Sequence, residues 1–305
     1  MFLRSHPKTA SCLLGLTGVL GILVNLFILH RVIYGKLFGK SFGRIWISRG
    51  IAYVAISALF AFYVPIVAFI DINLIYNIGW MRAIPHLMMF FGMTILYSNF
   101  LIAINRCIII SQPLQYKYLF CDLKTIIMIV CTWLIPFVSV LPNLVESPLD
   151  PCHQTPLDSD YSFFALPPEC HTLVNVLDLV VPSAAIIATI GVDLLAICRL
   201  RKFAQVRKKL TTSKAVKQNR NRELRLCCMI LVQAVVSIYA YISLGFAAFI
   251  DNEILQFLAS SFTWGLLQTI DGIVVILFNT EMHSSLRRKS TIPPRRTSEQ
   301  SFYVG

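Results

Sequence analysis

The stretch that decides the fold is ASCLLGLTGVLGILVNLFILHRVIY, which runs from Ala10 to Tyr34. A helix of about 20 mostly apolar residues crosses a hydrocarbon core about 30 Å thick, so this stretch is long enough to cross a bilayer once. It does not alternate apolar and polar residues over roughly ten-residue segments, as a strand of a membrane β-barrel would. No small-residue cleavage site ends it, which favours a retained membrane helix over a signal peptide.

Six further runs of the same kind follow along the chain. The 305 residues are 56% hydrophobic and 14% charged, with a mean hydropathy of +0.70, which is more apolar than a water-soluble domain can bury. We therefore predict an all-α membrane protein, a bundle of seven transmembrane helices. The predicted spans are Ala10 to Tyr34, Ile45 to Ile70, Arg82 to Ile110, Thr125 to Val145, Leu173 to Leu200, Leu224 to Ile250 and Leu255 to Asn279.

The distribution of cations predicts the orientation of these spans, because Lys and Arg in short loops stay on the cytoplasmic side. With the N-terminus outside, all of the 27 Lys and Arg residues except Arg4, Lys8 and Arg82 lie on or beside the cytoplasmic face; the cations at 31 to 49 are counted there. We expect a short extracellular N-terminus (1–9), a transmembrane domain (10–280) and a cytoplasmic tail (281–305). The net charge of +12 needs no nucleic acid, because the basic loops face anionic lipid and cytoplasmic partners.

Two of the nine cysteines, Cys152 and Cys170, lie in the long outer loop between spans four and five. The others lie in spans or on the cytoplasmic side, apart from Cys12 near the outer end of span one. Disulfides persist outside the cell, so we predict a Cys152–Cys170 bond that holds this loop as a lid. The chain-entropy contribution of such a bond is about 3 kcal/mol. Two free surface thiols are the alternative.

Polar residues within the spans are functional candidates, because ionisable groups are costly in hydrocarbon. By a rise of about 1.5 Å per residue, Asn25 lies about 22 Å and Asp271 about 24 Å from the outer ends of their spans. If the first and last helices are neighbours, Asn25 can hydrogen-bond Asp271, with Asn279 further inward in span seven. This contact fits either an activation switch or simple helix–helix adhesion.

The inner end of span three carries Asn105 and Arg106, where a guanidinium meets the cytoplasm. Arg106 is a candidate dock for a cytoplasmic partner, and an interfacial snorkelling arginine is the alternative. Asp193, near the inner end of span five, is a candidate counter-ion. The basic segment 199 to 225, which includes Arg222, is expected to prolong spans five and six as helices and to contact a cytoplasmic partner.

The outer halves of the spans hold the candidate ligand contacts. Arg82 and His86 are four residues apart and share one helical face, which suits a ligand with an acidic group. Interfacial anchoring and pairing with the acidic outer loops are the alternatives, and outer aromatic residues also occur as packing or as an interface belt. The remaining candidates are Asp178, Tyr239, Tyr241 and Trp264.

Catalytic and cofactor motifs are missing from the sequence. The six histidines show no zinc-ligand spacing in any span, and there is no phosphate-binding glycine loop or nucleophile elbow. We therefore expect neither an enzyme nor a bound metal or cofactor. Seven spans without visible repetition do not support a transporter, whereas an ion channel stays open.

Five stretches resemble the nematode serpentine chemoreceptors of class x (the Srx family), which are G-protein-coupled receptors. They are GVLGILVNLFIL (18–29), SFGRIWISRGIA (41–52), FYVPIVAFID (62–71), AINRCIIISQPLQYKYLF (103–120) and SFTWGLLQTIDGIVVILFNTEM (261–282). The resemblance implies a rhodopsin-like receptor architecture in the plasma membrane of a sensory-neuron cilium. It also implies a small-molecule ligand, a heterotrimeric G protein and a possible homo-oligomer as partners.

Several features depart from rhodopsin-like receptors. Asn105 replaces the acidic residue that precedes the arginine of span three, so the usual acidic restraint on Arg106 is missing. Met81 stands where those receptors have a cysteine, which strengthens the pairing of Cys152 with Cys170. Basic-directed phosphorylation sites are expected in the tail at Ser290, Thr291, Thr297 and Ser298.

A ligand-gated seven-transmembrane ion channel is the alternative function from another class. Insect odorant receptors form such channels, but their N-terminus lies inside the cell, against the cation distribution of this chain. A G-protein activation assay alongside whole-cell current separates the two hypotheses.

Overall fold

The computed structural model describes residues 7–35, 39–69, 79–145, 180–210, 214–247, 249–250, 252–279 and 282. Over these ranges the regular structure is helical, and seven helices are long and apolar enough to cross a membrane. The prediction of an all-α, seven-span membrane bundle is therefore confirmed. The candidate spans are Lys8–Gly35, Lys40–Ile66, Ala83–Ser111, Asp122–Leu141, Val181–Lys202, Cys228–Ala247 and Ile254–Phe278.

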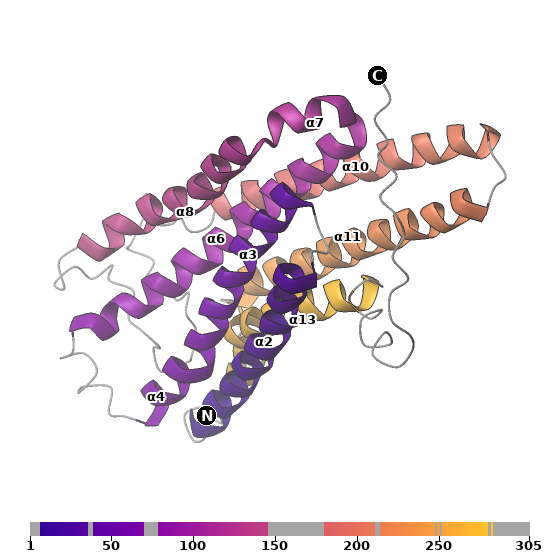
Figure 1. Ribbon diagram of the computed structural model, residues 1–305. Coiled ribbons are helices and arrows are strands. Elements are labelled where there is room, and N and C mark those ends of the chain that lie inside the picture. Colours follow the sequence, from indigo (N-terminus) through magenta and orange to yellow (C-terminus); the bar gives the residue numbers. More distant parts are fainter. Residues whose placement is uncertain are drawn as a thin grey trace, which may run out of the picture.

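The helices form an elongated bundle (Figure 1). α10 and α11 continue past their spans into the basic segment, as the sequence predicts, and project beyond the bundle at the end where α7 lies. The elements are α2 (Pro7–Gly35), α3 (Lys40–Ala58), η1 (Leu59–Tyr63), α4 (Val64–Phe69), α6 (Gly79–Ser111), α7 (Pro113–Leu119), α8 (Asp122–Val145), α10 (Val181–Leu210), α11 (Lys214–Ala247), α12 (Glu253–Phe257), η3 (Leu258–Phe262) and α13 (Thr263–Phe278).

Span two begins earlier than the sequence predicts. The predicted start was Ile45, whereas α3 begins at Lys40. At about 1.5 Å per residue, this start puts Arg49 about 13 Å from the inner end of its helix instead of about 6 Å. A residue counted among the cytoplasmic cations therefore lies well inside the membrane span.

Glycines on one face of α2 allow its backbone to approach α3 and η1 closely. A Cβ added to Gly18 would lie 2.7 Å from the carbonyl oxygen of Ser57 and 2.8 Å from the Cα of Ala61. One turn to either side, Gly15 lies against Pro65 and Gly21 against Ser57. Because lipid tails are as apolar as side chains, close backbone approach is a main source of helix association in a membrane.

Two π-helical turns interrupt spans two and seven, one near the C-terminal end of span two and the other near the N-terminal end of span seven. In η1 the amide of Val64 bonds to Leu59, because Pro65 has no N–H and its ring crowds the carbonyl of Ala61. In η3 the amide of Thr263 bonds to Leu258.

The two π-helical turns lie on either side of an aromatic contact. The ring of Phe60 packs edge-on against Trp264, with centroids 5.3 Å apart, and both side chains are buried. Phe60 and Trp264 belong to a core cluster that also includes Leu14, Ile56 and Met88. Spans one, two, three and seven therefore share one apolar core toward the end of the bundle where α2 begins.

Replacing Gly18 with alanine is expected to destabilise the bundle, because the new methyl group meets backbone atoms that cannot rotate away. We expect a loss of about 1–3 kcal/mol in the free energy of unfolding, measured by thermal unfolding of the purified receptor in detergent. Gly191→Ala is the matched control, because a Cβ there meets no atom within 4 Å. Equal stability of the two variants would contradict the close approach.

Candidate functional site

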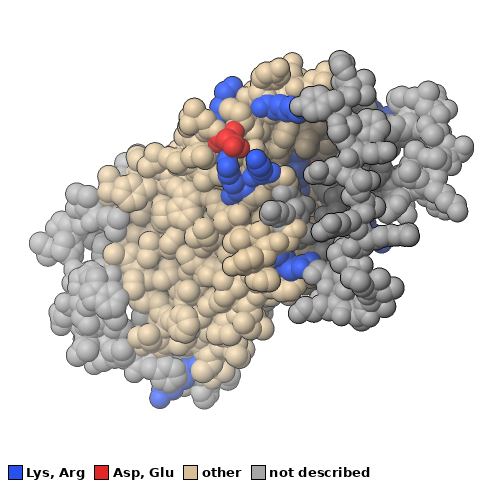
Figure 2. All heavy atoms as spheres, in the orientation of Figure 1, with Lys and Arg blue, Asp and Glu red and all other residues tan. Residues whose placement is uncertain are grey.

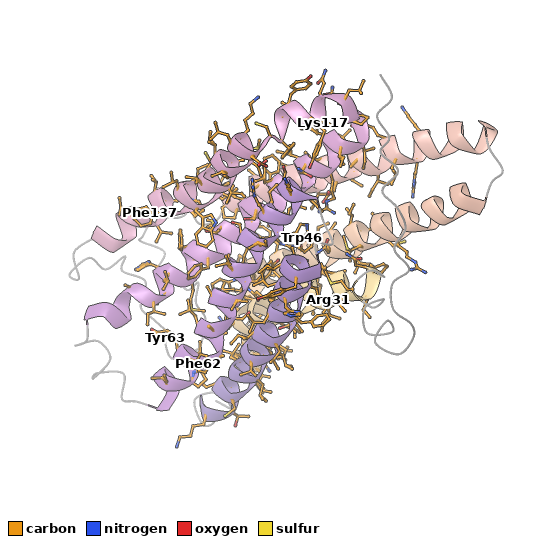
Figure 3. The ribbon with its side chains drawn as sticks, viewed as in Figure 1. Arg31, Trp46, Phe62, Tyr63, Lys117 and Phe137 are labelled. Carbon is orange, nitrogen blue, oxygen red and sulfur yellow. The ribbon has the colours of Figure 1, made fainter. Side chains whose placement is uncertain are left out.

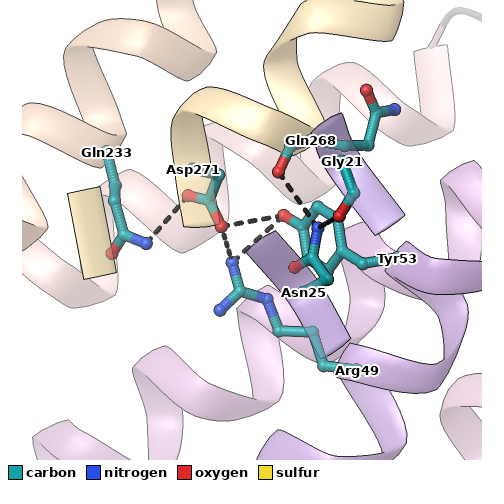
Figure 4. A network of polar contacts seen from close by, with 7 residues as sticks. All are labelled: Gly21, Asn25, Arg49, Tyr53, Gln233, Gln268 and Asp271. Carbon is teal, nitrogen blue, oxygen red and sulfur yellow. Dashed lines mark hydrogen bonds and ion pairs between the residues drawn. The ribbon is translucent and has the colours of Figure 1, made fainter. Parts of the chain in front are cut away.

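A buried ion pair joins spans two and seven. Arg49 of α3 pairs through Nη2 with Oδ2 of Asp271 on α13 (Figure 4). The two residues are only 4% and 8% exposed. Tyr53 closes a triangle, because its hydroxyl accepts from Arg49 at 3.0 Å and donates to the same carboxylate oxygen at 3.0 Å.

The other carboxylate oxygen of Asp271 is held by span six. Gln233 of α11 donates from Nε2 to Oδ1 at 2.8 Å. One carboxylate therefore connects α3, α11 and α13, so movement of α3 or α11 relative to α13 stretches or breaks a contact to this side chain.

Aromatic rings flank the buried guanidinium of Arg49. Its Cζ lies 4.8 Å from the ring centroids of both Trp46 and Tyr53. These residues are three before and four after Arg49, so the helical repeat places all three on one face of α3. The rings attract the cation through their negative faces and shield it from lipid.

Asn25 does not make the hydrogen bond with Asp271 that the sequence analysis proposed. Its Nδ2 donates instead to the carbonyl oxygens of Gly21, at 2.9 Å, and Gln268, at 3.4 Å. The first and last helices are neighbours as assumed, but Arg49, Tyr53 and Gln233 already occupy the carboxylate. Asn25 therefore ties α2 to the backbone of α13, beside the ion pair.

A second buried ion pair joins spans three and five. Nη2 of Arg106 on α6 lies 3.8 Å from Oδ1 of Asp193 on α10, and both side chains are 11% exposed. This distance is an ion pair without a direct hydrogen bond. The neighbouring Asn105 is buried, and its Nδ2 donates to the hydroxyl of Tyr116 on α7 at 3.3 Å.

The candidate ligand contacts are not all together. His86 on α6 and Trp264 on α13 are buried, and Trp264 belongs to the outer apolar core. The hydroxyl of Tyr241 bonds to Ser183 of α10. Tyr239 is 67% exposed, so it does not join the buried residues.

For some other predicted site residues the structure describes only the helix that carries them, and the rest lie outside the described residues. Arg82 and Arg222 lie in α6 and α11, and their side chains are outside the described set. Asn279 caps the inner end of α13. Within the described ranges no group of three His, Cys, Asp or Glu side chains is arranged to hold a metal. Outside the described residues lie Cys152, Cys170, Asp178, Ser290, Thr291, Thr297 and Ser298.

The amino-acid sequence of the seven-span region also matches a known family. The family model described as "Serpentine type 7TM GPCR chemoreceptor Srx" matches residues 16–279, which run from the first span to the C-terminal end of the seventh. The chain belongs to the Srx family. This Srx family is one of receptors, so the resemblance seen in the sequence is confirmed.

Two nematode relatives agree with this membership. The Srx chain is 23% identical over 314 residues to "Serpentine receptor class X 45" of Caenorhabditis elegans, covering 92% of this chain and 81% of that protein. It is 27% identical over 204 residues to "Serpentine receptor class X-43" of the same organism, covering 65% of this chain and 62% of that protein.

Removing one partner of the Arg49–Asp271 pair is expected to destabilise this Srx chain strongly, because the other charge stays buried. Arg49→Gln or Asp271→Asn should each cost about 3–5 kcal/mol in the free energy of unfolding. The double variant should cost less than the sum, because it leaves no buried charge. Thermal unfolding of the purified proteins in nanodiscs measures both.

The control pair is Arg44 and Asp122, which lie 3.0 Å apart with side chains 38% and 63% exposed. Arg44→Gln and Asp122→Asn should each change stability by no more than about 1 kcal/mol. If the buried and exposed pairs respond alike, Arg49 and Asp271 do not form an energetically coupled pair.

Proposed function

We propose that this Srx chain is a chemosensory receptor that binds a small external molecule and activates a heterotrimeric G protein. The observation that carries the proposal is the family match, which extends over all seven spans. The receptor acts in the plasma membrane of a sensory neuron, at the cilium, with its N-terminus outside. The cation distribution of the sequence supports this orientation.

The proposed topology has extracellular residues 1–9, a transmembrane domain of residues 10–280 and a cytoplasmic tail of residues 281–305. A Cys152–Cys170 bond holds the outer loop over the ligand site, with His86 and Trp264 below it. Phosphorylation of the tail at Ser290, Thr291, Thr297 and Ser298 weakens signalling by adding negative charge.

The two buried ion pairs supply the resting restraint in this proposal. Arg49–Asp271 holds α3, α11 and α13 together, and Arg106–Asp193 holds α6 to α10. A ligand bound in the outer half shifts the equilibrium if it binds better to a bundle in which these helices are displaced. Displacement of α6 from α10 frees the guanidinium of Arg106 for a cytoplasmic partner.

The short helix α7 presents an apolar side chain next to this charged site. Leu114 is 86% exposed, and α7 is fixed to α6 through the bond between Asn105 and Tyr116. An exposed leucine at the inner face is a suitable contact for a partner protein, because binding would remove its apolar surface from water. We therefore assign Leu114 and Arg106 to the G-protein contact.

Opposite effects are expected from the two members of the Arg106–Asp193 pair. Arg106→Ala should abolish ligand-evoked G-protein activation, because it removes the group that the partner engages. Asp193→Asn should raise basal activation severalfold, because it weakens the restraint while keeping Arg106. A G-protein activation assay, normalised to surface expression, measures both. Loss of activity in both variants at normal expression would contradict the restraint.

Leu114→Ala is expected to lower G-protein activation roughly 30-fold, since burying a leucine is worth about 2 kcal/mol at an interface. The control is Leu134→Ala on α8, which removes a side chain that is 53% exposed on a membrane-spanning segment. It should leave activation unchanged. Equal effects of both variants would mean that α7 is not a partner contact.

The ion-channel hypothesis is tested in the same cells. Ligand-evoked whole-cell current should disappear when G-protein signalling is blocked, if the receptor acts through a G protein. Current that persists under the block would overturn the proposal.

A further inference from the structure

The inner ends of α3 and α8 are locked together at one corner of the bundle. Ser41, in the first turn of α3, donates from its hydroxyl to the carbonyl oxygen of Phe120 at 2.7 Å. Arg44, one turn further, pairs with Asp122, the first residue of α8, at 3.0 Å. Two contacts therefore fix the N-termini of two spanning helices beside the end of α7.

This corner carries more positive than negative charge. Lys40 lies one turn before Arg44 on α3, Lys124 lies two residues after Asp122 on α8, and Lys117 lies in α7, which ends three residues before Asp122; all three lysines are exposed. In the part of the chain that the structure describes, none of the three lysines is paired with a carboxylate. Figure 2 shows the only acidic atoms drawn on this face surrounded by basic ones. Figure 3 shows Lys117 at the end of the bundle opposite to Phe62 and Tyr63.

Helix dipoles add to this positive charge. α3 and α8 both begin at the corner, so the partial positive charges of two helix N-termini point toward it. The N-cap of α3 is Gly39, whose residue type offers no side-chain oxygen to satisfy the first amides. Asp122 offsets the dipole of α8 only. The three lysines and the N-terminus of α3 therefore keep a positive charge that an external anion can neutralise.

The surface beside the corner belongs in lipid. Leu123, Ile126 and Ile127 of α8 are 69%, 47% and 53% exposed, and they lie within the first turns of the span Asp122–Leu141. Acyl chains must cover these side chains. Lys124 at the start of the same span, and Lys40 at the start of span two, therefore lie at the depth of the phospholipid headgroups.

We propose that this corner, formed by Lys40, Arg44, Lys117 and Lys124, binds the phosphorylated headgroup of an anionic phospholipid of the inner leaflet. A headgroup with several phosphates, as in a phosphoinositide, meets the lysines and Arg44, and its acyl chains lie along the exposed face of α8. The ion pair to Asp122 keeps Arg44 in position for the headgroup. The assignment to the inner leaflet rests on the proposed orientation with the N-terminus outside, and it does not depend on the proposed G-protein coupling.

Native mass spectrometry of the full-length receptor in detergent tests the site. The receptor is titrated with phosphatidylinositol 4,5-bisphosphate, phosphatidylserine or phosphatidylcholine. The phosphoinositide should bind most tightly and phosphatidylcholine least. Lys40→Gln, Lys117→Gln and Lys124→Gln combined should weaken phosphoinositide binding roughly 100-fold, since each lysine near a lipid surface contributes about a fivefold effect. The corresponding Lys→Arg variant should bind like the unmodified receptor, and its failure to bind would contradict a charge-based site.

The matched control removes three exposed cations from the inner end of span five, Val181–Lys202, as Arg199→Gln, Arg201→Gln and Lys202→Gln. It should change the affinity by no more than about threefold, because screened charges at the end of another span contribute little. Equal weakening by both triple variants would overturn the site, since binding would then follow total charge. Inositol trisphosphate that binds as tightly as the lipid would also overturn it, because the acyl chains would then have no role.

Discussion

The carboxylate of Asp271 is the constraint on which the inner half of the bundle depends. An unpaired charge in hydrocarbon is expensive, so Asp271 must have a cation and further hydrogen-bond donors wherever it lies. Arg49, Tyr53 and Gln233 meet this requirement from two other helices. The need to satisfy one side chain therefore fixes how three helices are placed, more specifically than non-directional apolar packing does.

The apolar core in the outer half has a different character. Phe60, Trp264 and their neighbours pack through shape, and close contact of α2 with α3 and η1 depends on glycines. Apolar packing of this kind is close-fitting but non-directional, whereas the ion pair and its hydrogen bonds are directional.

The sequence predicts the number, type and approximate positions of the helices well, because 20-residue apolar runs have few other structural outcomes. It predicts Asp271 as a key residue. It also predicts Asp193 as a counter-ion candidate, and the structure places Asp193 Oδ1 3.8 Å from Arg106 Nη2. It fails for Arg49. Positive charges near a span end are normally interfacial, so Arg49 was counted with the cytoplasmic cations.

Two signals in the sequence point to Arg49 in hindsight. Asp271 needs a cation at its own depth, and Trp46 and Tyr53 place aromatic rings on the same helical face as Arg49. The partner of Asn25 was not predictable from the sequence. The estimated depth shows which residues lie at the same height in the bundle, but not which of them bonds to the carboxylate of Asp271. Side-chain length decides here, since arginine reaches across from α3 while Asn25 is satisfied by nearby carbonyls.

The π-helical turns have a consequence for how such receptors diversify. A π turn accommodates one residue more than an α turn, so the residues beyond it are rotated by about 100° around the helix axis. Spans two and seven both contain one, at Leu59–Tyr63 and Leu258–Phe262, between the outer surface and the charged residues. This offset cancels the 100° that an extra residue adds to an α-helix, so a one-residue insertion or deletion is absorbed by gaining or losing the π turn, and the side chains on both sides of it keep their facing. The two spans can thus change length by one residue in evolution without rebuilding the linkage between Arg49 and Asp271.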